Sequence, residues 1–219
     1  MKNDLKKKYI QAAFEIIRKE GQQGISIRRL AKELNCNVAI LYRCFRDLDE
    51  LLLYVGLKYV EDYLHDLQPL LEEPVDNVKL FLNVWKCFAE HSFRNPQMYN
   101  SLFFGKYSEK LSYATEEYYT RLFPEELVQF DEEARVILMR GNFATGDATT
   151  SRVLNRCVDD GLIREEDRLY IDKLCLQIYK GYLKDFMDRR AGQEDIESVT
   201  GELNHYFTTI ISKYQIIES

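Results

Sequence analysis

The sequence predicts an all-α protein, and two observations support this fold class. Apolar residues recur at relative positions 0, 3, 4 and 7 in one segment after another, which places them on one face of a helix with 3.6 residues per turn. We find no segment with the regular alternation of apolar and polar residues that marks a half-buried strand. With 219 residues and 46% hydrophobic content, the chain can form one large helical domain, or a domain of about 50 residues joined to a larger one.

The first expected helix covers residues 3–20 and ends at Gly21. Its apolar face consists of Ile10, Ala13, Phe14 and Ile17. Lysines and arginines occupy other positions around it.

Residues 26–45 contain two short amphipathic segments joined by a polar turn. Their apolar faces consist of Ile27, Leu30, Ala31 and Leu34 in the first, and Val38, Leu41, Tyr42 and Phe45 in the second. The turn over residues 35–37 is about three residues long. Asn37 can cap the second segment, because its side-chain oxygen can accept from free backbone N–H groups, and Ser26 can cap the first. This is the pattern of a helix-turn-helix.

A fourth helix is expected from about Leu48 to Leu67, with Asp47 as its N-cap. The first four helices can then enclose one small core. Breaks beyond Pro69 delimit further helices at residues 76–93, 97–107, 109–122, 131–159, 165–189 and 195–216. The helix at 131–159 contains Gly141 and Gly146, where it can kink or divide. We therefore expect a DNA-binding domain over residues 1–47 and a helical ligand-binding and dimerisation domain over residues 48–219, with the helix from 48 to 67 connecting them.

The charge is unevenly distributed along the chain. The net charge is −6, yet residues 1–46 carry 11 Lys and Arg against 4 Asp and Glu, and the remainder carries 19 against 32. The basic part coincides with the helix-turn-helix. This asymmetry favours an N-terminal part that meets a polyanion such as double-stranded DNA, and an acidic body that does not.

The cysteines do not indicate a metal site. Cys36, Cys44, Cys87, Cys157 and Cys175 are odd in number, widely spread and without metal-ligand spacing, so we expect reduced thiols and no metal or cofactor. The sequence has no apolar run long enough to cross a bilayer and no signal-peptide pattern, which predicts a cytoplasmic protein without a membrane partner.

A recognition helix lies in the major groove with its N-terminal half at the base edges. We expect Arg43 and Asn37 to read bases, since an arginine can donate two hydrogen bonds to guanine, whereas Ala39 and Ile40 can make only apolar contacts. Tyr42 has a hydroxyl that can reach a phosphate while its ring packs. The outer side of the preceding helix is expected to contact phosphates through Arg28, Arg29 and Lys32, next to Ser26.

Aromatic residues in the body exceed what a single core-facing stripe needs. An apolar cavity with a few polar tips would have this composition, and so would a plain aromatic core. The candidate ligand-binding residues are Trp85, Phe88, His91, Phe103, Tyr107, Tyr118, Phe143 and Tyr182. Residues 165–189 and 195–216 are too apolar for one whole side to face solvent, and we expect this helix pair to form a homodimer with its copy.

The run from Ile10 to Leu53 resembles the N-terminal DNA-binding domain of the tetracycline-repressor (TetR) family of bacterial transcription regulators. The matching features are the glycine-bounded first helix, the ISIRRLAKEL helix, the LYRCF recognition helix and the acidic-Leu-Leu start of the fourth helix. The RNPQMY segment also resembles a helix junction common in the family. The resemblance covers about a quarter of the chain and implies a homodimer whose paired helix-turn-helices read DNA half-sites. It further implies a C-terminal ligand pocket whose occupation changes the spacing of the two heads.

The sequence departs from the family at three places. Asn35 and Cys36 stand where Gly and Val are usual, and an asparagine tolerates the left-handed conformation that Gly would supply. Ile40 replaces a frequent Thr, and Leu48 replaces a phosphate-contacting Lys, so that only backbone N–H groups are left for that contact. Weaker non-specific DNA binding is therefore expected, offset by Arg43 and Arg46. With Arg46, the expected DNA-binding set is Ser26, Arg28, Arg29, Lys32, Asn37, Val38, Ala39, Ile40, Tyr42, Arg43 and Arg46.

Three functions compete at this point. The leading hypothesis is a ligand-responsive transcription regulator, a repressor that binds a palindromic operator as a homodimer and responds to a small apolar ligand. The second is a DNA-binding adaptor whose helical body binds a protein partner. An enzyme has little support, because His65, His91 and His205 are isolated and no phosphate-binding loop or nucleophile-base spacing is present.

Overall fold

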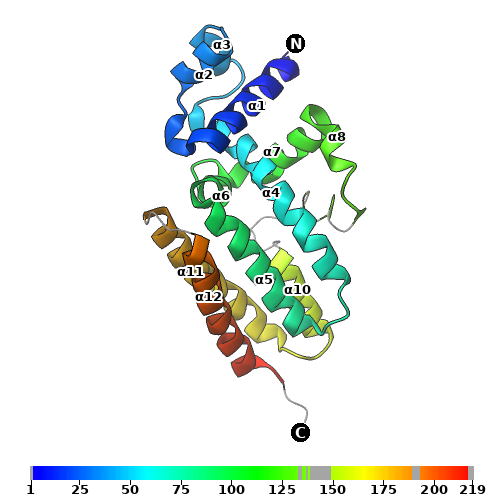
Figure 1. Cartoon of the computed structure of the whole chain (residues 1–219). Coiled ribbons are helices and arrows are strands. Elements are labelled where there is room, and N and C mark those ends of the chain that lie inside the picture. Colours follow the sequence, from blue (N-terminus) through cyan, green and yellow to red (C-terminus); the bar gives the residue numbers. More distant parts are fainter. Residues whose placement is uncertain (1, 133–134, 137, 139–148, 189–192, 217–219) are drawn as a thin grey trace. The chain divides into compact units, whose positions relative to one another are not determined.

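The computed structural model of the protein describes residues 2–132, 135, 136, 138, 149–188 and 193–216 (Figure 1). Every regular element in this part is helical, and an isolated antiparallel bridge joins Ile163 and Gln215. The predicted all-α class is therefore confirmed. Within the same residues, no helix combines the length and the hydropathy that crossing a bilayer requires.

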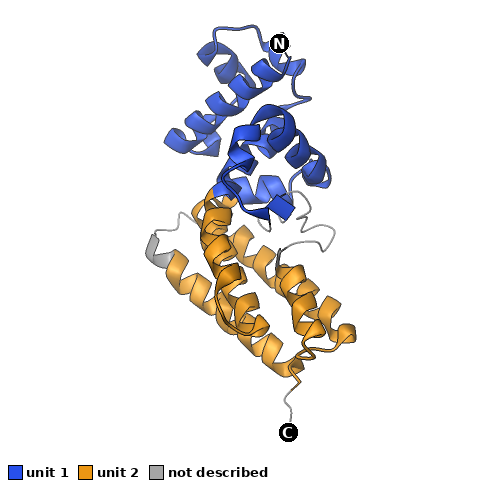
Figure 2. Ribbon diagram, turned by 90° about the vertical axis from the view of Figure 1, so that its right-hand side faces the viewer, with its two compact units in different colours: residues 1–61, 97–144 blue, residues 62–96, 145–219 orange. Residues whose placement is uncertain are grey.

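The chain packs into two compact units, which Figure 2 shows in different colours. Residues 1–61 and 97–144 make up the first unit, and residues 62–96 and 145–219 make up the second. The boundary expected after residue 47 follows the extent of the DNA-binding motif and stays a prediction. Packing instead groups the motif with residues 97–144, which are distant in sequence.

The first unit contains the helix-turn-helix and several shorter helices. Its elements are α1 (Lys2–Glu20), a 3₁₀ turn (Gln22–Gly24), α2 (Ile27–Glu33), α3 (Val38–Tyr42), the start of α4 (Leu48–Glu72), α6 (Pro96–Phe103), a 3₁₀ turn (Ser108–Lys110), α7 (Leu111–Glu117), a π-helical turn (Tyr118–Leu122) and α8 (Pro124–Leu127). The core expected among the first four helices is confirmed. Tyr9, Ile10, Leu30, Leu41 and Phe45 are all buried, and the rings of Tyr9 and Phe45 meet edge to face with centroids 6.5 Å apart.

The second unit is a bundle organised around α5. Its helices are the end of α4, α5 (Asn77–Arg94), α10 (Thr149–Asp159), α11 (Glu165–Asp188) and α12 (Gln193–Tyr214), and α5 packs against α10, α11 and α12. Asp76 caps α5 by accepting from the backbone N–H of Lys79 at 2.9 Å. All five cysteines are free thiols, as expected, and Cys87, Cys157 and Cys175 are buried.

The fourth helix is longer than expected. The sequence placed a break at Pro69, but α4 continues to Glu72 with Pro69 inside its last turn. A proline there removes one intrahelical hydrogen bond, and the helix ends three residues later, so the cost of the missing bond is confined to the end of the helix.

Three further boundaries differ from the expected ones. The helix expected at 97–107 ends at Phe103, and the one expected at 109–122 is divided into the 3₁₀ turn, α7 and the π-helical turn. Helix α8 falls where a break was expected, because Pro124 stands at the first helical position, where its missing N–H costs nothing. Of the helix expected at 131–159, α10 is observed, whereas Gly141 and Gly146 lie outside the described residues.

Candidate nucleic-acid interface

Side-chain caps define the two helices of the motif. Ser26 Oγ accepts from the backbone N–H of Arg29 at 3.2 Å, and Asn37 Oδ1 accepts from the backbone N–H of Ala39 at 2.9 Å. Asn35 lies between the helices with φ of 48°, the left-handed conformation expected for it. Both predicted caps and the predicted turn geometry are therefore confirmed, and Asp47 likewise caps α4 by accepting from Glu50 N–H at 3.0 Å.

The recognition helix is shorter than its apolar pattern suggested. It covers Val38–Tyr42, with Arg43 as its C-cap, and Phe45 follows after a turn that directs its ring into the core. Leu41 is fully buried, whereas Tyr42 is 54% exposed, so the expected packing of the Tyr42 ring is wrong. The reason is that the helix ends at Tyr42, and Phe45 fills the core position instead.

The predicted DNA-binding residues lie together on α2, α3, their caps and the start of the following loop. The exposed members are Ser26, Arg28, Lys32, Asn37, Ala39, Tyr42, Arg43 and Arg46, and the partly buried members are Arg29, Val38 and Ile40. None of the eleven is buried.

Arg29 differs from its basic neighbours because it already has an anionic partner. Its guanidinium donates to both carboxylate oxygens of Glu20 and to the Gly24 carbonyl at 2.8 Å. The hydrogen bond from Arg29 holds the pKa of the Glu20 carboxyl below its usual value. Arg29 thus joins the end of α1 to the start of α2. Because its guanidinium already donates to Glu20, only part of its hydrogen-bonding capacity is left for a phosphate.

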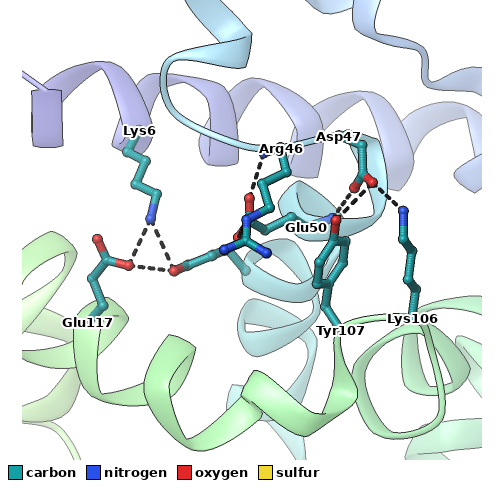
Figure 3. A network of polar contacts seen from close by, with 8 residues as sticks. Lys6, Arg46, Asp47, Glu50, Lys106, Tyr107 and Glu117 are labelled. Atoms are coloured by element: carbon teal, nitrogen blue, oxygen red, sulfur yellow. Dashed lines mark hydrogen bonds and ion pairs between the residues drawn. The ribbon is translucent and has the colours of Figure 1, made fainter.

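A polar network outside the motif holds α1 against α7 within the first unit (Figure 3). The buried Lys6 ammonium donates to Glu117 Oε2 at 2.7 Å and to the Tyr54 hydroxyl at 3.0 Å, and Tyr54 also donates to Glu117. Burial would raise the pKa of the Glu117 carboxyl, but the hydrogen bonds from Lys6 and Tyr54 outweigh it and lower that pKa. Sequence reasoning missed this network because Lys6 and Glu117 share no local pattern.

A second set of contacts in the same unit fixes the N-cap of α4. Asp47 Oδ2 accepts from Lys106 Nζ at 2.6 Å and from the Tyr107 hydroxyl at 2.9 Å (Figure 3). The carboxylate therefore caps α4 with one oxygen and binds the segment after α6 with the other. The capping signal predicted half of this role, and nothing in the sequence indicated the rest.

The predicted ligand-binding residues are divided between the units. In the second unit Trp85 and Phe88 are buried, and both rings contact Tyr179, with centroids 5.6 and 5.2 Å from it. His91 Nε2 lies 2.8 Å from an Asp66 carboxylate oxygen, and Tyr182 contacts Tyr206. Phe103, Tyr107 and Tyr118 belong to the first unit, where all three are buried, and Phe143 lies outside the described residues. The members of the set thus belong to both units, and their common role stays a prediction.

The first unit thus presents a capped helix-turn-helix whose basic side chains are largely exposed. No known family model matches the sequence, and no curated protein matches it either. The fold, however, is similar to that of solved structures over nearly the whole chain. A TetR-family regulator from Mesorhizobium loti is 16% identical with a TM-score of 0.52, and the match covers 99% of this chain and 100% of the other.

Two further solved structures agree with this comparison. A TetR-family regulator from Shewanella sp. PV-4 is 14% identical with a TM-score of 0.51, covering 99% of this chain and 100% of the other. A structure described as the molecular basis for control of antibiotic production by a bacterial hormone is 13% identical with a TM-score of 0.56, covering 97% of this chain and 98% of the other. The protein therefore has the all-helical fold of the TetR-family transcription regulators.

Proposed function

We propose that this protein is a transcription regulator that binds a palindromic operator as a homodimer and acts as a repressor. The observation that carries the proposal is the capped helix-turn-helix, whose predicted DNA-binding side chains are all at least partly exposed. Residues 1–46 contain 11 basic and 4 acidic residues, and this surplus of positive charge attracts phosphates.

Within this interface, contacts divide by geometry into positioning and base reading. Arg28 and Lys32 are exposed on α2 and position the motif on phosphates, and Arg43 reads a base edge. Asn37 uses its side-chain oxygen to cap α3, so its contribution to base reading is the amide N–H₂ group, which can donate to an acceptor on a base.

The dimer is proposed to form through α11 and α12. Three large apolar side chains on these helices face solvent in the single chain, namely Leu169, Tyr170 and Tyr206, which are 52%, 53% and 45% exposed. Gly181 and Gly201 have no neighbouring atoms where a side chain would begin, so a second helix can approach closely there. An exposed apolar face on two long helices is what a four-helix interface between copies would bury.

A response to a small apolar ligand belongs to the same proposal. One solved structure of this fold is described as the molecular basis for control of antibiotic production by a bacterial hormone, and a regulator that responds to a chemical signal is consistent with that description. The second candidate, a DNA-binding adaptor for a protein partner, is favoured by a different observation. The ring of Trp85 contacts the rings of both Tyr179 and Phe207, as in a filled core.

The test of DNA binding is a fluorescence binding assay on the DNA upstream of the protein's own gene. A specific complex at moderate salt is expected, and a folded dimer that forms no such complex would overturn the proposal. Thermal-shift screening of chemical classes then separates the two candidates: a shift with one class supports the ligand response, and a uniform lack of shift supports the adaptor.

A further inference from the structure

A basic groove lies in the first unit between the recognition helix, α1 and α7. It has a volume of about 530 Å³, and its lining includes Lys2 and Lys6 from α1, Tyr42 and Arg43 at the end of α3, and Lys110 and Tyr113 at the start of α7. The last two residues lie more than 60 positions beyond the helix-turn-helix. The groove therefore joins the motif to a segment that no sequence pattern connects with DNA.

The charge of the basic groove is only partly neutralised. Lys6 is paired with Glu117 at 2.7 Å, and Arg46, which also lines the groove, lies 4.0 Å from Glu50. In the part of the chain that the structure describes, Lys2, Arg43 and Lys110 form no hydrogen bond or ion pair with a carboxylate. The Lys110 ammonium instead lies 4.9 Å from the centroid of the Tyr107 ring. Three cations thus remain available to an anion.

Two exposed tyrosines complete the basic groove. Tyr42 is 54% exposed and Tyr113 is 62% exposed, so that both hydroxyls can reach a bound group. Ammonium, guanidinium and phenol groups together are the side-chain donors that contact phosphate oxygens in protein–DNA interfaces. Most of the residues that line the groove carry a charge or a phenol group, which favours an anionic ligand over a purely apolar one.

We propose that the basic groove binds the sugar-phosphate backbone of DNA beside the half-site, with Lys110 and Tyr113 as DNA-contacting residues outside the helix-turn-helix. This inference rests on the proposed function. It adds Lys110 and Tyr113 to the proposed interface. Both residues are distant from the helix-turn-helix in sequence but pack in the same first unit.

Continuity with the recognition helix favours DNA over a small anion. Arg43 and Lys2 line the basic groove and also a second depression of about 480 Å³ that includes Ile40 of α3. A backbone leaving the major groove at the end of α3 would therefore pass directly from one depression to the other. A free phosphate would occupy only one point of this track.

The position of Lys110 relative to α3 is fixed by contacts within the same unit. The Lys6–Glu117 pair holds α1 against α7, and Tyr107, three residues before Lys110, donates to Asp47 at 2.9 Å. A phosphate bound at Lys110 would therefore lie at a fixed position relative to the recognition helix. It would strengthen binding to any sequence, because phosphates carry no base information.

The experiment measures the affinity of the full-length wild type and of Lys110→Ala for upstream DNA and for random DNA over a range of salt concentrations. Lys110→Ala is expected to weaken binding to both DNAs by about three- to ten-fold and to make the slope of log K against log salt shallower by about one. Lys110→Arg keeps the charge and should retain the wild-type slope. Lys19→Ala is the matched control, because Lys19 is exposed on α1 but does not line the groove.

The outcomes separate this inference from the proposed function. A wild type that binds no DNA overturns both. A wild type that binds, with Lys110→Ala and Lys19→Ala indistinguishable from it, overturns only the groove. A thermal shift with pyrophosphate that Lys110→Ala abolishes, while its DNA affinity stays unchanged, would assign the groove to a small anion and would also overturn the inference.

Discussion

Lys6 of α1 and Glu117 of α7 are 111 positions apart in sequence and form an ion pair with an N–O distance of 2.7 Å. The Lys6 ammonium also lies over the ring of Tyr54 in α4, 4.1 Å from its centroid. The contacts of Lys6 therefore join three helices of the first unit, namely α1, α4 and α7. The helix-turn-helix is therefore built together with residues 97–127, and a change in that segment acts on the framework that carries the recognition helix.

Replacing Glu117 by Gln should destabilise the protein, because the Lys6 ammonium would be left buried without an anion. Fully buried pairs lose about 3–5 kcal/mol on such a change, and the loss here should be about 2 kcal/mol, because Glu117 keeps some contact with water. Urea unfolding at pH 7 measures it. Glu116→Gln, at an exposed neighbouring position, is the control and should change the free energy of unfolding by no more than about 0.5 kcal/mol. Equal effects of the two substitutions would show that the pair does not stabilise the fold.

The contribution of Glu117 should depend on pH with a defined sign. Burial raises the pKa of this carboxyl, but Lys6 and Tyr54 lower it more, so the folded-state pKa lies below the ordinary value of about 4.3. The stabilisation is then fully present above pH of about 4.3, and it is lost as the pH falls through the folded-state pKa. The difference in unfolding free energy between wild type and Glu117→Gln should shrink in this range. A difference that stays constant down to pH of about 3 would contradict the assignment.

The turn of the motif offers a test of backbone conformation. Asn35 has φ of 48°, where a side chain with a β-branch is strained by about 1–2 kcal/mol. Asn35→Val should therefore lower the free energy of unfolding by about that amount, whereas Asn35→Gly should be neutral or slightly stabilising. Thermal unfolding of the two variants gives the comparison, and a stable Asn35→Val protein would mean that the turn has another conformation.

Base reading and phosphate contact should separate in DNA binding. Arg43→Ala should cost about 1–3 kcal/mol on operator DNA and much less on random DNA, because its bidentate contact depends on the base. Lys32→Ala should weaken both complexes equally and reduce the salt dependence. Titrations of both variants on both DNAs measure this, and equal losses for Arg43→Ala on the two DNAs would reassign Arg43 to the backbone.

The dimer proposal predicts a specific sensitivity to charge on α12. Tyr206→Lys should shift the protein from dimer to monomer, because a buried ammonium would replace an aromatic ring at the interface. Light scattering after size-exclusion chromatography measures the mass. Val128→Lys, at a position that is 72% exposed in the first unit, should remain dimeric. A monomeric wild type would contradict the dimer itself.

Local patterns in the sequence sufficed for much of the fold. The spacing of apolar residues predicted α1, α5, α11 and α12 to within a few residues, because each helix buries one face. Ser26, Asn37 and Asp47 were predicted as caps, since the groups that they satisfy lie two or three residues away. Where a boundary depended on tertiary packing, as at Pro69 and after Phe103, the local pattern failed.

The sequence by itself determined the all-helical class, the helix-turn-helix with its capped turn, and the concentration of positive charge in residues 1–46. These properties depend on residues that interact with near neighbours, so their spacing is visible in the chain. Only the tertiary structure decided that Glu117 neutralises Lys6, that Asp47 binds Tyr107, and that Lys110 lines a groove with Arg43. The physical reason is that these contacts join residues about 60 or more positions apart, and their distances are set by how whole helices pack rather than by any local period.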